Sequence, residues 1–192
     1  MNAKEYLEIL HVAERLKDTP RHCTTSKRRT ESVAEHSWRM ALMAMLLKNE
    51  FPDTDTDKVM AMCVIHDLGE CFTGDIPTFS KTDADRRKED ELLEDWLRTL
   101  PAEISGRFTA LFREMDEQKT AEAKLFKAID KLEALIQHNE SPLDTWSENE
   151  RELNKVYAFD TAAFSQWLTA LRKEILNETL EKLDEDNAES DK

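Results

Sequence analysis

Residues 59–78 read VMAMCVIHDLGECFTGDIPT, and this stretch decides the expected fold because an apolar run ends abruptly at a His-Asp pair. His66 lies on the apolar stripe of that run, so its side chain is expected to be buried. Asp67 follows directly, and burying an ionised carboxylate without a cationic partner is strongly unfavourable. The stretch therefore predicts a helix over residues 58–67 that ends beside a cation, and then a loop over residues 69–77.

Helix-forming residues dominate on both sides of this stretch, and the chain of 192 residues contains only three glycines. No segment alternates polar and apolar residues over a convincing strand length. The sequence therefore predicts an all-α, single-domain helical bundle over residues 1–183. Residues 184–192 read DEDNAESDK, which predicts an acidic, flexible, frayed tail. The expected helices cover residues 4–17, 32–49, 58–67, 83–99, 102–117, 121–138, 148–157 and 161–183.

The formal net charge of −14 argues against a general DNA- or RNA-binding surface, because it repels the phosphate backbone. The acid-free segment 21–29, RHCTTSKRR, is expected to be a loop and is the candidate for a basic pocket that binds a small anion. An ordinary solvated charge cluster is the alternative. Frequent charges at the N-terminus and the absence of a long apolar run predict a soluble protein with no signal peptide and no membrane span. Three cysteines, one of them inside the apolar run, predict reduced thiols in a cytoplasmic setting.

His36 and Asp130 give similar signals elsewhere in the chain, because each is a polar residue at or beside an apolar helical stripe. Taken alone, each has a common structural explanation: a hydrogen-bonded core histidine, and a salt bridge from Asp130 to a neighbouring lysine. Together with His66 and Asp67 they form a set of two imidazoles and two carboxylates. That set suits one divalent transition-metal ion, namely Mn, Co, Fe or Zn, with positions left open for water and substrate.

The pattern H…HD…D, with SVAEHS around the first histidine and HDLGECFTGDIPT around the doublet, resembles the HD superfamily. It is similar in particular to the YfbR-like 5′-deoxynucleotidases and their HDDC-type relatives. The resemblance covers residues 16–138 and implies an HD-type helical bundle. It also implies that the metal ligands are His36, His66, Asp67 and Asp130.

The resemblance extends to residues around the metal. Glu70 matches the catalytic glutamate, and Arg21 matches the arginine that orients the phosphate. Asp75 matches a position at the substrate and is a second candidate for proton transfer. A surface acid for Glu70 and a turn residue for Asp75 are the structural alternatives. The remaining matches at the substrate border are Ile76, Pro77 and Thr78.

One residue departs from the family pattern. Bacterial members have a tryptophan after the arginine, where it packs against the nucleoside sugar. This chain has His22 there, so a preference for 2′-deoxyribose does not follow from the resemblance.

The expected activity is hydrolysis of (deoxy)nucleoside 5′-monophosphates to nucleoside and phosphate through metal-activated water. The small-molecule nucleotide is the expected partner, and the resemblance implies a homodimer. Two alternatives stay open. The same site would act on cyclic nucleotides, nucleoside triphosphates or guanosine tetraphosphate, or the chain is a non-catalytic helical interaction module.

Overall fold

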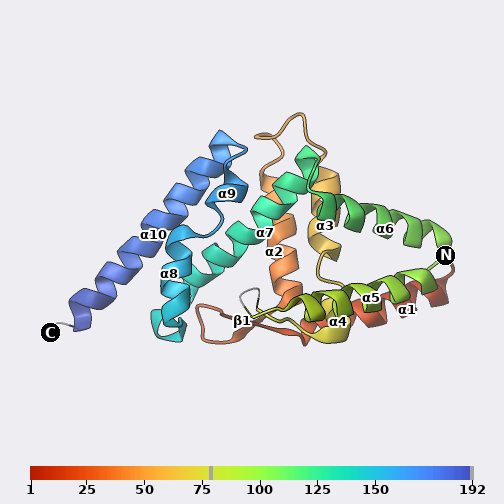
Figure 1. Cartoon of the computed structure of the whole chain (residues 1–192), viewed down its shortest axis with the longest axis horizontal. Helices are drawn as coiled ribbons and strands as arrows, with labels where there is room; N and C mark the ends of the chain where they lie inside the picture. Colours follow the sequence, from red (N-terminus) through yellow and green to blue (C-terminus); the bar gives the residue numbers. More distant parts are fainter. Residues whose placement is uncertain (78–79, 191–192) are drawn as a thin grey trace.

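The computed structural model describes residues 1–77 and 80–190, with backbone alone for 186–190. The described part is helical apart from one two-stranded antiparallel sheet, as predicted for an all-α protein (Figure 1). The helices are α1 (Ala3–Ala13), η1 (Glu14–Lys17, 3₁₀), α2 (Val33–Leu46), α3 (Thr56–Ile65), α4 (Glu70–Thr73), α5 (Asp83–Thr99), α6 (Ala102–Glu117), α7 (Ala121–Glu140), η2 (Leu143–Thr145, 3₁₀), α8 (Glu148–Val156), α9 (Phe159–Ala162) and α10 (Gln166–Ser190). The strands are β1 (Pro20–Thr24) and β2 (Thr30–Ser32).

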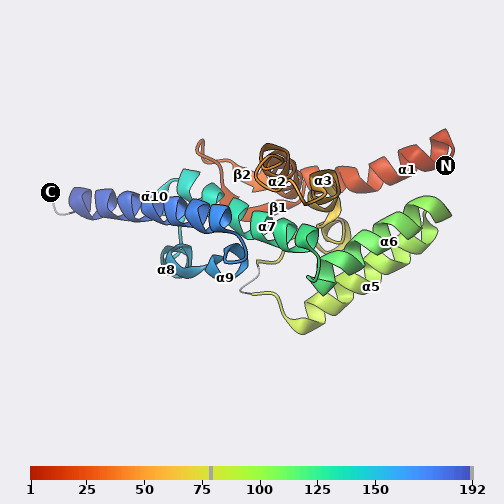
Figure 2. The ribbon, with the colours of Figure 1, turned by 90° about the horizontal axis from the view of Figure 1, so that it is seen from above.

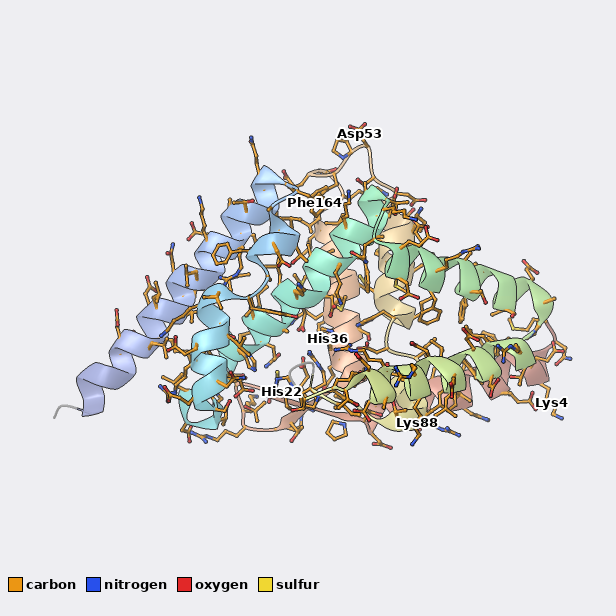
Figure 3. The ribbon with its side chains drawn as sticks, viewed as in Figure 1. Lys4, His22, His36, Asp53, Lys88 and Phe164 are labelled. Carbon is orange, nitrogen blue, oxygen red and sulfur yellow. The ribbon has the colours of Figure 1, made fainter. Side chains whose placement is uncertain are left out.

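The core lies where α2, α3 and α7 pack against one another. Met40, Met62 and Ile129, one from each helix, are completely buried. Burying an aliphatic or thioether side chain of this size contributes about 1.5–3 kcal/mol, so this three-helix contact is a main source of stability. The four predicted metal ligands lie on these three helices or just after their ends. Figure 3 shows His36 well inside the molecule, while Lys4 lies far out on α1.

Helices α5 and α6 run side by side and are connected to the core through α4 and α7 (Figure 2). Their bounds agree with the predicted helices over 83–99 and 102–117. Thr82 caps α5, and Gln118 ends α6 in the left-handed conformation at φ 51°. The α5–α6 pair forms one wall of the cavity described below.

Three predicted elements need correction. Residues 20–32 contain an antiparallel hairpin instead of a plain loop, with Pro20 opposite Ser32 and Thr24 opposite Thr30. Part of the predicted loop over 69–77 is the short helix α4. The last helix is divided into α9 and α10, and α10 continues to Ser190 instead of ending near Leu183.

Two further features concern the surface. Within the described ranges, no helix combines the length and the apolar character needed to cross a membrane. Helix α1 has no buried residue, and Tyr6, Leu7 and Leu10 are 44–51% exposed. These three side chains therefore lie outside the core of the single chain, whereas Ile9, Val12 and Ala13 of the same helix pack against it.

Candidate active site

The structure brings the four predicted metal ligands together. His36 comes from α2, His66 and Asp67 follow the end of α3, and Asp130 comes from α7. The donor atoms of His36, His66 and Asp67 lie within 4.8 Å of one another. Asp130 Oδ1 lies 3.4 Å from His36 Nε2 and 4.0 Å from His66 Nε2. His36 and Asp130, which are 94 positions apart in sequence, thus lie close enough to bind the same ion.

Hydrogen bonds fix both imidazoles with Nε2 turned inward. His66 Nδ1 donates to the Cys63 carbonyl oxygen at 2.9 Å, and His36 Nδ1 donates to Glu133. A neutral ring that donates through Nδ1 carries a lone pair at Nε2. His66 Nε2 lies 3.0 Å from Asp67 Oδ2, yet this buried nitrogen has no hydrogen-bond partner among the described residues. Two acceptors that face each other without a proton between them fit a bound cation, so the residues present suit a divalent ion.

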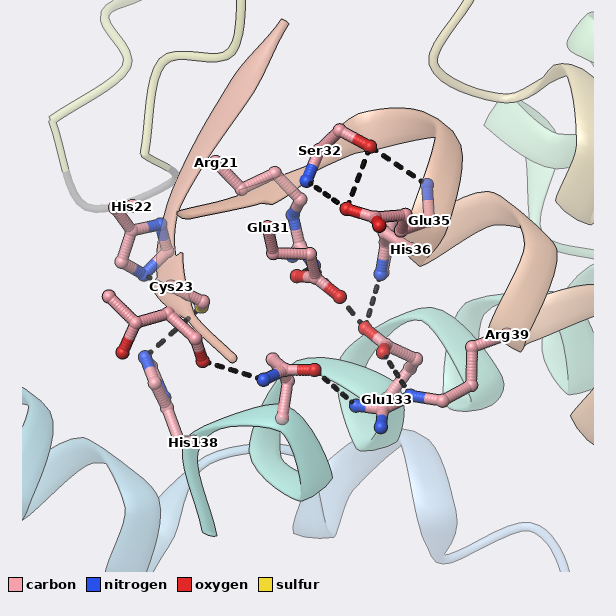
Figure 4. Close-up of polar contacts among 12 residues, drawn as sticks. Arg21, His22, Cys23, Glu31, Ser32, Glu35, His36, Arg39, Glu133 and His138 are labelled. Atoms are coloured by element: carbon pink, nitrogen blue, oxygen red, sulfur yellow. Dashed lines mark hydrogen bonds and ion pairs between the residues drawn. The ribbon is translucent and has the colours of Figure 1, made fainter. Parts of the chain in front are cut away.

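Glu133 holds His36 in this orientation and was not predicted from the sequence. Its carboxylate is completely buried and also accepts from Arg39 Nε at 2.7 Å and from Arg21 Nη1 at 3.3 Å (Figure 4). Burial alone would raise the pKa of Glu133, but His36 and the two arginines outweigh it and lower the pKa to about 2. A buried carboxylate on the second nitrogen of a ligating histidine is the usual way to fix its tautomer.

Asp130 is shared between the histidines and a lysine. Lys127 Nζ donates to Asp130 Oδ2 at 2.7 Å, while Oδ1 is the atom nearest the imidazoles. Burial opposes ionisation, but Lys127 and the two histidines hold the pKa of Asp130 well below its usual value. Asp130 therefore forms the salt bridge considered as an alternative through Oδ2, while Oδ1 faces the other candidate ligands. Lys131 pairs with Asp160 instead.

An open cavity of about 920 Å³ lies next to the candidate metal ligands. All four predicted ligands line it, as do Arg21, Glu70, Asp75 and Ile76. Lys81 and Arg86 add positive charge on the side of α5. Pro77 and His22 are not among the lining residues, and Thr78 lies outside the described residues.

Glu70 and Asp75 are the predicted proton carriers. Glu70 is only 7% exposed, and its Oε2 atom is buried without a hydrogen-bond partner in the described part of the chain. Burial, followed by the neighbouring charges of Asp67 and Asp75, raises the pKa of Glu70 to about 9. Burial also raises the pKa of Asp75. Both carboxyls can therefore hold a proton at a higher pH than an exposed acid would.

Arg21 is the only residue of the segment 21–29 that lines the cavity. Its Nη1 donates to Glu31 at 2.8 Å, in addition to the contact with Glu133. Burial disfavours the charged form, but the charges of Glu133, Cys23 and Glu31 raise the pKa of Arg21, so it stays a cation. Arg28 and Arg29 are exposed and pair with Asp144 and Glu35. The predicted basic pocket therefore reduces to Arg21.

Residues 13–172 match the model of the HD domain family. The 5′-deoxynucleotidase HDDC2 of Homo sapiens is 31% identical over 142 residues, which cover 72% of this chain and 69% of the human protein. The protein of that name from Danio rerio is 33% identical over 145 residues, covering 70% of this chain and 68% of the fish protein. Among solved structures, a predicted metal-dependent phosphohydrolase from Magnetospirillum magnetotacticum matches with a TM-score of 0.79 at 26% identity, covering 93% of this chain and 95% of that one.

Proposed function

The chain belongs to the HD-domain family, and on that premise we propose that it hydrolyses (deoxy)nucleoside 5′-monophosphates to nucleoside and inorganic phosphate. The relatives named 5′-deoxynucleotidases and the structural match to a metal-dependent phosphohydrolase identify the chain as a metal-dependent nucleotide phosphohydrolase. The monophosphate is our narrower choice among nucleotide substrates. An intact ligand set argues against a non-catalytic interaction module.

One observation carries the proposal: two inward-facing imidazole Nε2 atoms and two carboxylates meet at the edge of a large cavity. His36, His66, Asp67 and Asp130 would hold the ion, for which Mn, Co, Fe and Zn are the candidates. A divalent ion supplies an activated water and offsets charge on the phosphoryl oxygens when it is bound.

The remaining roles fall to groups that line the cavity. Glu70, whose pKa is raised by burial, holds a proton near neutral pH and can donate it to the leaving oxygen. Asp75 is a second proton carrier beside the substrate. Arg21 presents a charged, planar fork to the phosphate, and among described residues its contacts are made through Nη1.

Other substrate contacts stay predictions from the resemblance. Ile76, Pro77 and Thr78 are proposed to border the nucleoside. The resemblance places His22 beside the sugar, but in the structure its Nε2 atom faces Glu150 and Cys23.

A substrate panel tests the proposal. The purified chain with Mn²⁺ or Co²⁺ is given deoxy- and ribonucleoside 5′-monophosphates, cyclic nucleotides, triphosphates and guanosine tetraphosphate, and products are separated by chromatography. We expect nucleoside and phosphate from the monophosphates. Turnover of cyclic or polyphosphate substrates alone would overturn the proposal. Asp67→Ala, prepared in the same way, controls for a contaminating phosphatase.

We also propose a homodimer in a cytoplasmic setting. The exposed apolar side chains of Tyr6, Leu7 and Leu10 on α1 support self-association, because a second copy would remove them from water. The net charge of −14 supports a small nucleotide, and not a nucleic-acid polymer, as the partner. Sedimentation equilibrium that finds a monomer at micromolar concentration would contradict the dimer.

A further inference from the structure

A second group of side chains of the types that bind metals lies outside the catalytic cavity, where β1 meets the end of α7 and the start of α8. It consists of His22, Cys23, His138 and Glu150. Cys23 Sγ lies 3.3 Å from His138 Nε2 and 3.8 Å from His22 Nε2 (Figure 4). Glu150 Oε1 lies 3.4 Å from His22 Nε2 and 3.5 Å from His138 Nε2. The donor atoms of His22, Cys23 and His138 lie within 4.8 Å of one another, and Glu150 adds a carboxylate oxygen beside the two imidazoles.

These separations are close to four of the six edges of a zinc tetrahedron. Bonds of about 2.3 Å to sulfur and about 2.0–2.2 Å to nitrogen or oxygen give ligand–ligand edges of roughly 3.3–3.6 Å. The four measured separations run from 3.3 to 3.8 Å. The donor set of two imidazoles, one thiolate and one carboxylate also matches the ligand preference of Zn²⁺.

Outer contacts hold two of the ligands in a binding orientation. His138 Nδ1 lies 3.0 Å from Asn154 Oδ1, and a neutral ring that donates to Asn154 presents its lone pair at Nε2 toward Cys23. Glu150 uses Oε2 in the capping box of α8, where it accepts from the backbone nitrogen and the hydroxyl of Ser147. Its other oxygen, Oε1, is the one that faces the two histidines.

The backbone of β1 brings two neighbouring residues to this one place. Adjacent side chains of a regular strand point to opposite faces. The pairing of β1 with β2 is irregular between Pro20 and Thr24, so His22 and Cys23 both reach the cluster. Local irregularities of this kind commonly redirect a side chain at a functional site.

Burial and charge distinguish a metal site from a reactive thiol. Cys23 is 2% exposed, too little for attack on a dissolved substrate. One thiolate and one carboxylate carry two negative charges, which a divalent cation neutralises.

We propose that His22, Cys23, His138 and Glu150 form a second, structural metal site that takes Zn²⁺. Four protein ligands complete a tetrahedron and leave no open position, as in structural zinc sites. The ion would connect β1, which carries Arg21, to α7 and α8. None of its four ligands belongs to the proposed catalytic metal set, so this site does not depend on the proposed function.

Cobalt spectroscopy tests the proposal without measuring activity. The chelator-treated full chain is titrated with Co²⁺ under reducing, thiol-free conditions, and thiolate-to-cobalt charge-transfer absorption is recorded in the near ultraviolet. The predicted catalytic ligands include no thiol, so this absorption reports the second site alone. We expect the band in the wild type and in Asp67→Ala, and its loss in Cys23→Ser. Cys71→Ser, which removes another buried free thiol, is the matched control and should keep the band.

Zinc affinity gives an independent measurement. Glu150→Gln keeps a residue that supports the capping box but removes the ligand charge, so the fold is preserved. Loss of a residue that only orients a ligand typically weakens metal binding about 10–100-fold. Because Glu150 is proposed as a ligand itself, we expect Glu150→Gln to weaken zinc binding at least about tenfold. Absence of the charge-transfer band in the wild type, or an unchanged band in Cys23→Ser, would overturn the proposal.

Discussion

Glu133 is the residue on which the geometry of the candidate site depends most. A completely buried carboxylate is unfavourable unless charged partners surround it, and here His36, Arg21 and Arg39 all donate to it. These contacts connect the ligand His36 to the proposed phosphate-binding Arg21. One side chain therefore orients both the metal site and the anion site.

Replacing Glu133 with glutamine should weaken metal binding about 10–100-fold, because the amide no longer offers a charged acceptor to His36 Nδ1. Calorimetric titration with Mn²⁺ measures the change. Glu140→Gln is the matched control, since Glu140 also pairs with Arg39 but its side chain is 50% exposed. Equal affinities in the two variants would contradict the role of Glu133.

Asp67→Ala and Glu70→Ala should separate metal binding from proton transfer. We expect Asp67→Ala to lose both turnover and bound metal, because it removes a ligand. Glu70→Ala should retain the metal and lose roughly 10²–10⁴-fold in kcat, the usual contribution of a positioned proton carrier. Metal analysis beside steady-state kinetics distinguishes the two. Loss of metal from Glu70→Ala would mean that Glu70 is itself a ligand.

The sequence identifies the four candidate ligands because each is a polar residue on or beside an apolar stripe, within motifs that resemble one family. Glu133 gives a comparable signal between Ile129 and Ile136, but no motif connects it to His36, which lies 97 residues away. The second cluster is still harder to predict. Cys23 and His138 are 115 residues apart, and only the hairpin geometry brings them together.

The start of α2 shows which elements can be read from local sequence. Ser32 and Glu35 form a capping box, and Glu35 also pairs with Arg29. The hydrogen bond from Arg29, with a smaller contribution from Ser32 against the opposing effect of burial, lowers the pKa of Glu35 to about 2. This helix carries His36, so its capped end helps to position a candidate ligand.

Glu35→Gln should alter the pH dependence of stability. The folded-state pKa of Glu35 is below the ordinary value of 4.5, so its stabilisation is present above pH 4.5 and is lost as the pH falls toward 2. The difference in Tm between wild type and Glu35→Gln should therefore shrink over that range. Thermal unfolding at a series of pH values measures it, with Glu91→Gln on the exposed face of α5 as control. A difference that does not change with pH would refute this assignment.

Elements with strong local boundary signals were predicted well, and elements formed by tertiary contacts were not. The bounds of α5 and α6 follow from Thr82, Pro101 and the helix-forming residues between them. Strands β1 and β2 span only five and three residues, too short for an alternating pattern to be recognised. The break between α9 and α10 likewise lacks a proline or glycine in the sequence.

The whole molecule is organised around one junction, because α2, α3 and α7 supply both the buried core and the four candidate ligands or the helix ends beside them. Anything bound there stabilises the native state relative to the unfolded chain. Metal binding and folding should therefore be coupled.

Removing metal should lower the stability of the whole chain. At a free ion concentration 100 times Kd, binding contributes about 2.7 kcal/mol, which corresponds to roughly 5–10 °C in Tm for a domain of this size. The shift in Tm is measured by differential scanning calorimetry of chelator-treated protein, with and without added Mn²⁺. Asp67→Ala should lose most of it, and a full shift in that variant would place the stabilising ion elsewhere.

The most direct test of the metal site is a crystal structure of Glu70→Ala with Mn²⁺ and a deoxynucleoside 5′-monophosphate, using manganese-specific anomalous scattering. We predict a peak in contact with His36, His66, Asp67 and Asp130, with the phosphate beside Arg21. Manganese bound elsewhere, with none of these four side chains in contact, would contradict the account.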